Sequence, residues 1–428
     1  ELRIEKLIAG GFSLARTGDG KVALLDAGYP GEVVLASKKK GRSDFRTMKV
    51  ERVLVPSNSR RDRLCINFPV CGGCDWQTLD YSRQLFWKRE VIKEQFKRVG
   101  KIELEDFEIV PSPKETNYRL KMEFVCYRGK DGLSLGLYRR NSNSPVSCQG
   151  CVLGLKDFER ARSVLEEILR KTSIVPYNRV TGKGELKHVI LRGNGREIMA
   201  MLVTKGERLP DENRILLEVK KKLPVISTLV HLMNANDRVV MRGVSRTLFG
   251  EGIIDQELSG RKFEIPPVAF FQNNLEVTES IVSHILNEMK DSNSDSLLDL
   301  YSGIGTFSIT VGKKMGSVTA VESNPVSIKA LKANSNLNGM FGTEIVSSDV
   351  IEFLKSDGRR YSTVILDPPR SGVGSEIGLL DKFGASMVFY VSCDPTTLAR
   401  DTAKLRELGY GISSVKAFDM FPQTWHVE

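Results

Sequence analysis

The sequence predicts an α/β fold in three parts: a small N-terminal β-barrel of the OB type, a central α+β domain, and a C-terminal parallel sheet. Three observations lead to this prediction. Short strands broken by glycine occupy residues 1–57, hairpin and helix patterns mix over residues 58–262, and strands alternate with helices over residues 263–428. We therefore expect three domains with these boundaries.

The N-terminal segment reads as short strands separated by turn sequences such as Thr17-Gly-Asp-Gly20. The clearest strands are Leu2–Ile8, Lys21–Leu25, Glu32–Ala36 and Met48–Val55. Several short strands within so few residues favour a closed barrel. From Lys38 to Arg63 there are ten lysines and arginines against three carboxylates, which favours a nucleic-acid surface over a merely solvated loop.

The composition describes an ordinary globular protein with a basic surface. Apolar residues make up 41% of the chain, charged residues 27%, and the formal net charge is +10. A basic surface suits a polyanion, because each neutralised phosphate releases counterions. No apolar run approaches the roughly 18 residues that a membrane span needs, and no leader pattern opens the sequence. We expect a cytoplasmic protein that does not contact membranes.

The central segment combines two helices with two hairpins. Helical periodicity covers Asp80–Val99 and Asp157–Lys171. The first hairpin joins Arg119–Arg128 to Leu133–Arg140 through a glycine-containing turn, and the second joins Lys187–Arg192 to Glu197–Thr204. This mixture predicts an α+β domain.

The C-terminal segment predicts a parallel sheet whose strands are separated by helices. The apolar runs are Ser296–Leu300, Ser317–Val321, Glu344–Val346, Thr363–Leu366 and Met387–Val391, and helix-like stretches include Leu275–Met289 and Pro325–Asn336. Ligands of such sheets bind at the carboxyl ends of the strands. Functional residues should therefore follow the apolar runs directly.

A glycine-rich loop containing Gly303 and Gly305 follows the first of these strands. It lacks the third glycine of the dinucleotide fingerprint, but the next strand ends in Glu322, about 20 residues further on, where an acid can accept both ribose hydroxyls. This combination favours S-adenosylmethionine over a nicotinamide cofactor. Asp349 follows the third strand and is placed to reach the adenine amine. Alternatively, Glu322 and Asp349 cap the helices that follow them.

Two further motifs concern the chemistry. Asp367 precedes two prolines, which hold it extended, so that its carboxylate can project beside the transferred methyl group. That motif also fits enzymes that methylate exocyclic amino groups. Cys393 follows the last strand, and a thiolate there can add to carbon 6 of uracil, which makes carbon 5 nucleophilic. The alternative for Cys393 is a buried, inert thiol. His426 and Glu428 are candidates for the base that removes the carbon 5 proton.

Together these motifs resemble those of the RNA uridine-C5 methyltransferase family, above all Val391–Asp401 and Asp419–Glu428. The resemblance implies an N-terminal TRAM domain, a central domain and a Rossmann-like S-adenosylmethionine-dependent methyltransferase domain. It also implies that Cys393 is the nucleophile and Glu428 the base. The implied cofactor contacts are Gln272 within Phe270-Phe-Gln-Asn273, Tyr301, Gly303, Gly305, Thr306, Glu322, Asp349 and Asp367.

Five of the seven cysteines lie in two short stretches, a pattern that favours metal ligation over disulfides. Cys65, Cys71 and Cys74 supply three thiols, and Cys148 or Cys151 a fourth. Four thiolates fit either zinc or an iron–sulfur cluster. The spacing resembles that of the iron–sulfur branch of the family, which implies a [4Fe-4S] cluster held by Cys65, Cys71, Cys74 and Cys151.

We therefore expect a monomeric enzyme that methylates carbon 5 of a uridine in structured RNA. The resemblance to the iron–sulfur branch favours 23S ribosomal RNA as the substrate, with transfer RNA as the alternative. Two other hypotheses remain at this point. One is a nucleic-acid methyltransferase acting on exocyclic amino groups, and the other is an inactive RNA-binding protein that keeps the fold.

Overall fold

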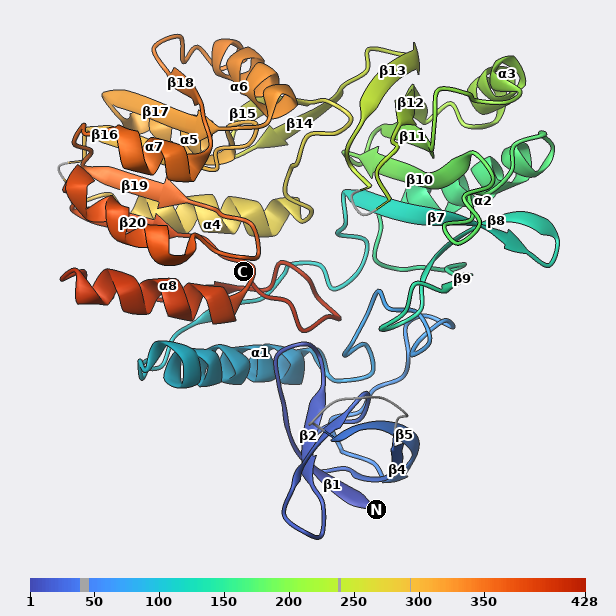
Figure 1. Cartoon of the computed structure of the whole chain (residues 1–428), viewed down its shortest axis with the longest axis horizontal. Coiled ribbons are helices and arrows are strands. Elements are labelled where there is room, and N and C mark those ends of the chain that lie inside the picture. Colours follow the sequence, from blue (N-terminus) through green and yellow to red (C-terminus); the bar gives the residue numbers. More distant parts are fainter. Residues whose placement is uncertain (39–45, 238–239, 293) are drawn as a thin grey trace. The chain divides into compact units, whose positions relative to one another are not determined.

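The computed structural model describes residues 1–38, 46–237, 240–292 and 294–428. The chain forms two compact units (Figure 1). The first contains residues 1–115 together with residues 393–428, and the second contains residues 116–392. The predicted domain boundaries at residues 57 and 262 stay predictions.

The first unit begins with a closed five-stranded barrel, as expected from the sequence. Its strands follow the spatial order β1-β2-β3-β5-β4. They are β1 (Leu2–Leu7), β2 (Ser13–Arg16), β3 (Val22–Leu25), β4 (Val33–Lys38) and β5 (Arg46–Val55). Alternate side chains such as Ile4, Ala15, Leu25 and Val34 fill the interior. Residues 39–45 of the predicted basic stretch lie outside the described residues.

The rest of the first unit joins two helices to the C-terminal segment. Helix α1 (Tyr81–Gln95) ends in a single π turn, η1 (Phe96–Gly100), and α8 spans Pro395–Glu407. Strand β6 (Ile109–Val110) pairs in parallel with β21 (Ala417–Phe418). Ile92, Phe96, Ala399, Ala417 and Val427 share one apolar cluster, so both helices and the last residues of the chain are packed together.

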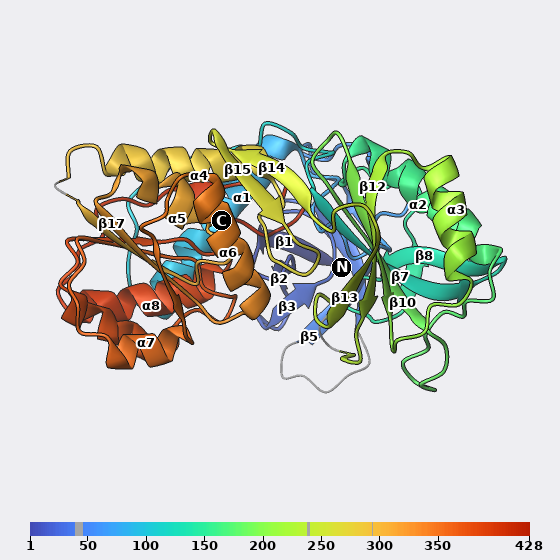
Figure 2. The ribbon, with the colours of Figure 1, turned by 90° about the horizontal axis from the view of Figure 1, so that it is seen from above.

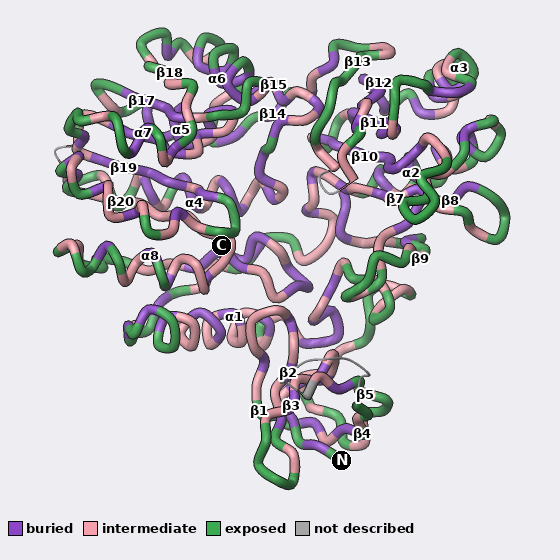
Figure 3. The backbone as a smooth tube through the Cα atoms, in the orientation of Figure 1, coloured by how far each residue is buried: buried purple, intermediate pink, exposed green. Residues whose placement is uncertain are grey.

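The second unit contains a seven-stranded sheet in the order β13-β12-β11-β10-β7-β8-β9. Its strands are β7 (Lys121–Gly129), β8 (Gly132–Tyr138), β9 (Pro145–Ser147), β10 (Leu186–Gly193), β11 (Ile198–Thr204), β12 (Ile226–Met233) and β13 (Val244–Phe249). Both predicted hairpins form, as β7–β8 and β10–β11. Every residue of β10 and β11 is buried, because these strands lie in the middle of the sheet (Figure 3).

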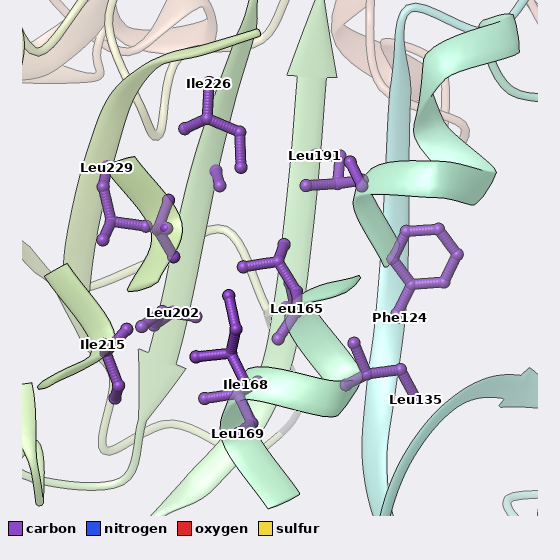
Figure 4. Close-up of a cluster of buried hydrophobic side chains, with 14 of the residues drawn as sticks. Phe124, Leu135, Leu165, Ile168, Leu169, Leu191, Leu202, Ile215, Ile226 and Leu229 are labelled. Carbon is purple, nitrogen blue, oxygen red and sulfur yellow. The ribbon is translucent and has the colours of Figure 1, made fainter. Parts of the chain in front are cut away.

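Helices α2 (Lys156–Arg170) and α3 (Glu212–Lys222) cover one face of this sheet (Figure 2). Their apolar stripes meet the alternate side chains of the strands in a single core that includes Phe124, Leu165 and Leu202 (Figure 4). Cys126 is 2% exposed within this core and is therefore a structural residue.

The second unit also contains a five-stranded, fully parallel sheet in the order β18-β17-β16-β19-β20. Its strands are β16 (Ser296–Leu300), β17 (Ser317–Glu322), β18 (Glu344–Ser347), β19 (Thr363–Leu366) and β20 (Met387–Tyr390). The intervening helices are α5 (Thr306–Thr310), η2 (Gly312–Lys314), α6 (Pro325–Leu337), α7 (Val350–Ser356) and η3 (Gly374–Phe383). Helix α4 (Leu275–Glu288) and the hairpin β14 (Ile254–Leu258) with β15 (Arg261–Ile265) precede the sheet.

This arrangement confirms the predicted Rossmann-like domain and shows where a ligand should bind. From β16 the chain adds β17 and β18 on one side, then crosses to add β19 and β20 on the other. The strand order therefore reverses between β16 and β19, and ligands of such sheets bind at the carboxyl ends of the strands at this point. None of the helices in the described ranges is long and apolar enough to cross a membrane.

Candidate active site

The glycine-rich loop between β16 and α5 contains two glycines in the left-handed region of backbone conformation. Gly303 and Gly305 have φ angles of +57° and +97°. A Cβ on Gly305 would lie 2.6 Å from Leu331 Cδ1 and 2.8 Å from Ile309 Cδ1. The loop therefore packs closely against α5 and α6 at Gly305, where a side chain would not fit. Thr306 is the first residue of α5, directly after this turn.

Glu322 joins the end of β17 to the glycine-rich loop. Its Oε2 accepts a hydrogen bond from the Gly303 amide at 2.9 Å, and its Oε1 accepts from the amides of Ser323 and Asn324, each at 2.8 Å. The cap of α6 is Asn324, whose side chain accepts from the amides of the first turn. The alternative that Glu322 only caps the following helix is therefore wrong, whereas its contact with a ribose stays a prediction.

Asp349 does cap its helix. Its Oδ1 accepts from the amides of Ile351 and Glu352 at the start of α7, at 2.8 and 3.4 Å. The capping alternative from the sequence thus accounts for one carboxylate oxygen of Asp349. The predicted contact of Asp349 with adenine would then use its other carboxylate oxygen, Oδ2. This contact stays a prediction.

The structure brings together two residues that lie far apart in the sequence. Gln272 Nε2 donates to Asp367 Oδ2 at 3.1 Å, which joins the segment before α4 to the carboxyl end of β19. Burial raises the pKa of Asp367 to about 7, the neighbouring carboxylate of Asp299 adds to this rise, and the Gln272 hydrogen bond opposes it. Tyr301, the first residue after β16, adopts a φ of +62°.

Asp299 is a candidate that the sequence reasoning missed. It is fully buried, and its Oδ2 accepts from both the amide and the hydroxyl of Ser308 in α5. Burial raises the pKa of Asp299 to about 7. The sequence contained a signal for it, because an acid in the middle of an otherwise apolar buried strand needs a special reason.

Arg192 is a second residue that was missed. Its fully buried guanidinium donates to the carbonyl oxygens of Pro266 at 3.3 Å and Ala269 at 2.6 Å. Burial lowers the pKa of Arg192 to about 10, and Glu123 opposes that shift. Asn273 Oδ1 also accepts from a backbone amide of β7 at 2.7 Å. The segment that carries Gln272 is therefore fastened to the seven-stranded sheet.

The candidate nucleophile and base belong to the first unit. Cys393 is half-buried and directly precedes Asp394, whose carboxylate accepts from the amides of Thr396 and Thr397 and so caps α8. Glu428 is paired through its backbone with Phe418: each amide donates to the other's carbonyl oxygen, at 2.8 and 2.9 Å. Two hydrogen bonds thus fix the position of Glu428.

Each sulfur of the first cysteine stretch accepts a nearby N–H group. The donors are Asn67 Nδ2 to Cys65 at 3.7 Å, the Gly73 amide to Cys71 at 3.4 Å and Gln77 Nε2 to Cys74 at 3.4 Å. Hydrogen bonds of this kind suit ligating thiolates. Nevertheless, within the described ranges no group of three or more His, Cys, Asp or Glu side chains has the arrangement of a metal site. The structure does not support the predicted cluster, nor does it support zinc.

The two candidates for the fourth thiol differ in their surroundings. Cys148 is 1% exposed in the core beneath the seven-stranded sheet, where its thiol donates to the Leu135 carbonyl oxygen at 3.7 Å. Cys151 is half-buried at the margin of the same core. Cys148 is therefore already hydrogen-bonded within the core, whereas Cys151 lies at its edge, and the choice of Cys151 as the fourth ligand stays a prediction.

Comparison with known proteins identifies the family. The profile of the tRNA (Uracil-5-)-methyltransferase family matches residues 244–428. An RNA methyltransferase of Thermotoga maritima is 40% identical over the whole of this chain and 97% of its own length. One from Clostridium acetobutylicum is 32% identical over the whole chain and 96% of its own length.

A solved structure agrees with these relatives. The tRNA (uracil-54, C5)-methyltransferase of Pyrococcus abyssi, in complex with S-adenosyl-L-homocysteine, is similar with a TM-score of 0.78 and 26% identity. The similarity covers all of this chain and 97% of the other. With the carboxylates gathered at the carboxyl edge of the parallel sheet, these findings show that the chain belongs to a family of S-adenosylmethionine-dependent RNA methyltransferases, within which its residues 244–428 match the tRNA (Uracil-5-)-methyltransferase profile.

Proposed function

We propose that this protein methylates carbon 5 of a uridine in structured RNA through a covalent adduct with Cys393. The observation that carries the proposal is the position of Cys393 in the chain. It follows β20 by three residues and lies within the region that the family profile matches. Methylation of an exocyclic amino group needs no thiol at this point, because the amino nitrogen has its own electron pair.

The chemistry divides one difficult step into three easier ones. The Cys393 thiolate adds to carbon 6 of the uracil, and the electrons of the carbon 5–carbon 6 double bond move to give an enolate. S-adenosylmethionine supplies the electrophilic methyl group. Carbon 5 takes that methyl group, and S-adenosylhomocysteine leaves. Glu428 then removes the carbon 5 proton, the double bond re-forms, and the thiolate is expelled.

The carboxyl edge of the parallel sheet supports the binding of the methyl donor. We assign the ribose hydroxyls to Glu322, whose carboxylate already organises the glycine-rich loop. Asp367 and Gln272, held together by their hydrogen bond, would face the positively charged part of the donor. We assign five further residues to S-adenosylmethionine: Tyr301, Gly303, Gly305, Thr306 and Asp349.

We propose that Cys65, Cys71, Cys74 and Cys151 hold a [4Fe-4S] cluster. Its support is the set of three thiols that accept N–H groups, together with the half-buried Cys151. A bound [4Fe-4S] cluster would stabilise the fold there. The test is anaerobic purification followed by analysis of iron, sulfide and zinc, with Cys74→Ser as the comparison. Four irons per chain support the cluster, and zinc without iron refutes it.

The RNA substrate has two candidates. The resemblance to the iron–sulfur branch favours 23S ribosomal RNA, whereas the solved structure with the similar fold is described as a transfer RNA enzyme. Mapping of 5-methyluridine in both RNAs from a deletion strain decides between them. A missing modification in transfer RNA alone would refute the ribosomal proposal. We also propose that the protein acts as a cytoplasmic monomer.

The proposed function is tested by methyl transfer from labelled S-adenosylmethionine to RNA transcripts. Cys393→Ala should abolish formation of 5-methyluridine and of a protein–RNA adduct that survives denaturation. Ser392→Ala is the neighbouring control and should retain both. Unchanged methyl transfer by Cys393→Ala would refute the covalent mechanism and favour an amino-group methyltransferase. Absence of S-adenosylmethionine binding by calorimetry in the wild-type protein would favour an inactive RNA-binding protein.

A further inference from the structure

A buried ion pair fastens the C-terminal segment to helix α1. The side chains of Lys88 and Asp419 both have 0% exposure, and the Lys88 ammonium donates to Asp419 Oδ1. Lys88 Nζ also donates to the Phe421 carbonyl oxygen at 3.1 Å, and the Tyr81 hydroxyl donates to Asp419 Oδ2 at 2.8 Å. A buried ion pair persists only when further hydrogen bonds satisfy both charges, as they do here. The proposed chemistry does not use either charge.

A second pair on the same face of α1 holds the same segment. Gln84 lies one turn before Lys88, and its side chain exchanges two hydrogen bonds with Gln423, each 3.0 Å long. The Gln423 side-chain oxygen also accepts from Arg61 at 2.7 Å. Gln423 has a φ of +71°, a conformation that a residue with a Cβ adopts only when its surroundings impose it. The segment 419–423 is therefore held by α1 in one conformation.

This held segment is directly connected to Glu428. Asp419 follows Phe418, the residue whose backbone exchanges both hydrogen bonds with Glu428. The Asp419 amide donates to the Val110 carbonyl oxygen at 2.9 Å, which continues the β6–β21 pairing. Val427 is 3% exposed in the apolar cluster that includes α1. A shift of Asp419 must therefore move the backbone that positions Glu428.

We propose that Lys88 is a positioning residue for proton removal from carbon 5. The inference rests on the proposed function, in which Glu428 takes that proton. The Lys88–Asp419 pair fixes the Phe418–Glu428 pairing, and through it the place of the Glu428 carboxylate. When the carbon 5–hydrogen bond breaks, its electrons form the carbon 5–carbon 6 double bond, and the carbon 6–sulfur bond releases the Cys393 thiolate. Loss of Lys88 should slow this last step and leave the preceding methyl transfer in place.

The test uses Lys88→Met, which keeps the length of the side chain and removes the charge. It measures methyl transfer separately from the later proton removal and release of the thiolate. Methyl transfer in a single turnover should stay within about threefold of wild type, whereas steady-state turnover should fall about a hundredfold, the usual contribution of a general base. A methylated protein–RNA adduct should accumulate on denaturing gels. Lys97→Met, the same substitution at an exposed ion pair of η1, is the matched control and should behave as wild type.

Two further variants test the same positioning role if Lys88→Met alone does not fold. Lys88→Met with Asp419→Asn removes both charges and leaves no unpaired buried carboxylate, so we expect it to fold and to show the same accumulation of adduct. Gln84→Met, which removes the neighbouring contact, should give a weaker form of that defect. An equal loss of methyl transfer and turnover in the variants would show a purely structural role and overturn the proposal, as would normal turnover without adduct.

A wrong role for Lys88 and a wrong covalent mechanism give different experimental results. Activity of Cys393→Ala would refute the covalent mechanism, whatever Lys88 does. The positioning role of Lys88 can be tested separately in the protein without RNA, by measuring the hydrogen-exchange rates of the Phe418 and Glu428 backbone amides. Both should exchange faster in Lys88→Met than in wild type. Unchanged exchange of these two amides would overturn the positioning role.

Discussion

The buried carboxyl of Asp299 should make the unliganded protein less stable as the pH rises. Asp299 is fully buried in β16, and within the described part of the chain its Oδ1 has no hydrogen-bond partner. Burial raises the pKa of this carboxyl from 3.8 to about 7. Because the pKa in the folded state exceeds that in the unfolded state, the stabilisation is complete below about pH 4. It is lost as the pH rises through 7.

The size of the effect follows from the shift. Each pKa unit corresponds to roughly 1.4 kcal/mol, so the loss approaches about 4 kcal/mol in total and about 2–3 kcal/mol between pH 5 and pH 8. Asp367 shifts in the same direction, but it retains some exposure and interacts with Asp299. We therefore base the magnitude on Asp299 alone.

The substitution Asp299→Asn isolates the contribution of this carboxyl, because the amide keeps an oxygen that can accept from Ser308 but cannot ionise. The assay is urea unfolding without ligand at pH 5, 6, 7 and 8, followed by hydrogen exchange in peptides from β16 and β19. Between pH 5 and pH 8 the free energy of unfolding of wild type should fall by about 2–3 kcal/mol more than that of the variant. Asp255→Asn, at an exposed position of β14, is the control and should leave the wild-type slope unchanged. Equal slopes for wild type and Asp299→Asn would refute the reasoning.

Three further predictions concern the cofactor edge and the core. Glu322→Gln should weaken S-adenosylmethionine binding by about tenfold to a hundredfold in calorimetry, since hydrogen bonds to a charged group contribute roughly 1.5–3 kcal/mol; unchanged affinity would contradict the assignment. Arg192→Met should also weaken binding, but in a Gln272→Ala background it should add little, because Arg192 acts by positioning that segment; additive losses would show separate roles. Leu165→Ala, in the core of the seven-stranded sheet, should reduce the free energy of unfolding by about 2–5 kcal/mol in urea titrations, and a loss below 1 kcal/mol would mean that the cavity collapses.

The sequence alone determined the fold class and the main strands of the parallel sheet, because periodicity is a local property. The apolar runs at residues 296–300 and 363–366 became β16 and β19 with the same limits, and the closed barrel was expected from its short strands. The position of functional residues after the strands also followed from the pattern. Glu322 and Asp367 lie where this rule placed them, at the carboxyl ends of β17 and β19.

The tertiary structure alone decided which polar groups are buried together. Gln272 and Asp367 are 95 positions apart, and Lys88 and Asp419 are separated by 331, so no local pattern could pair them. Whether an acid caps a helix or serves another group also depends on its neighbours: Asp349 caps α7, whereas Glu322 holds the glycine-rich loop. The physical reason is that burial and hydrogen bonding depend on which distant segments meet. A repeating pattern of apolar residues specifies only the face that each segment turns inward.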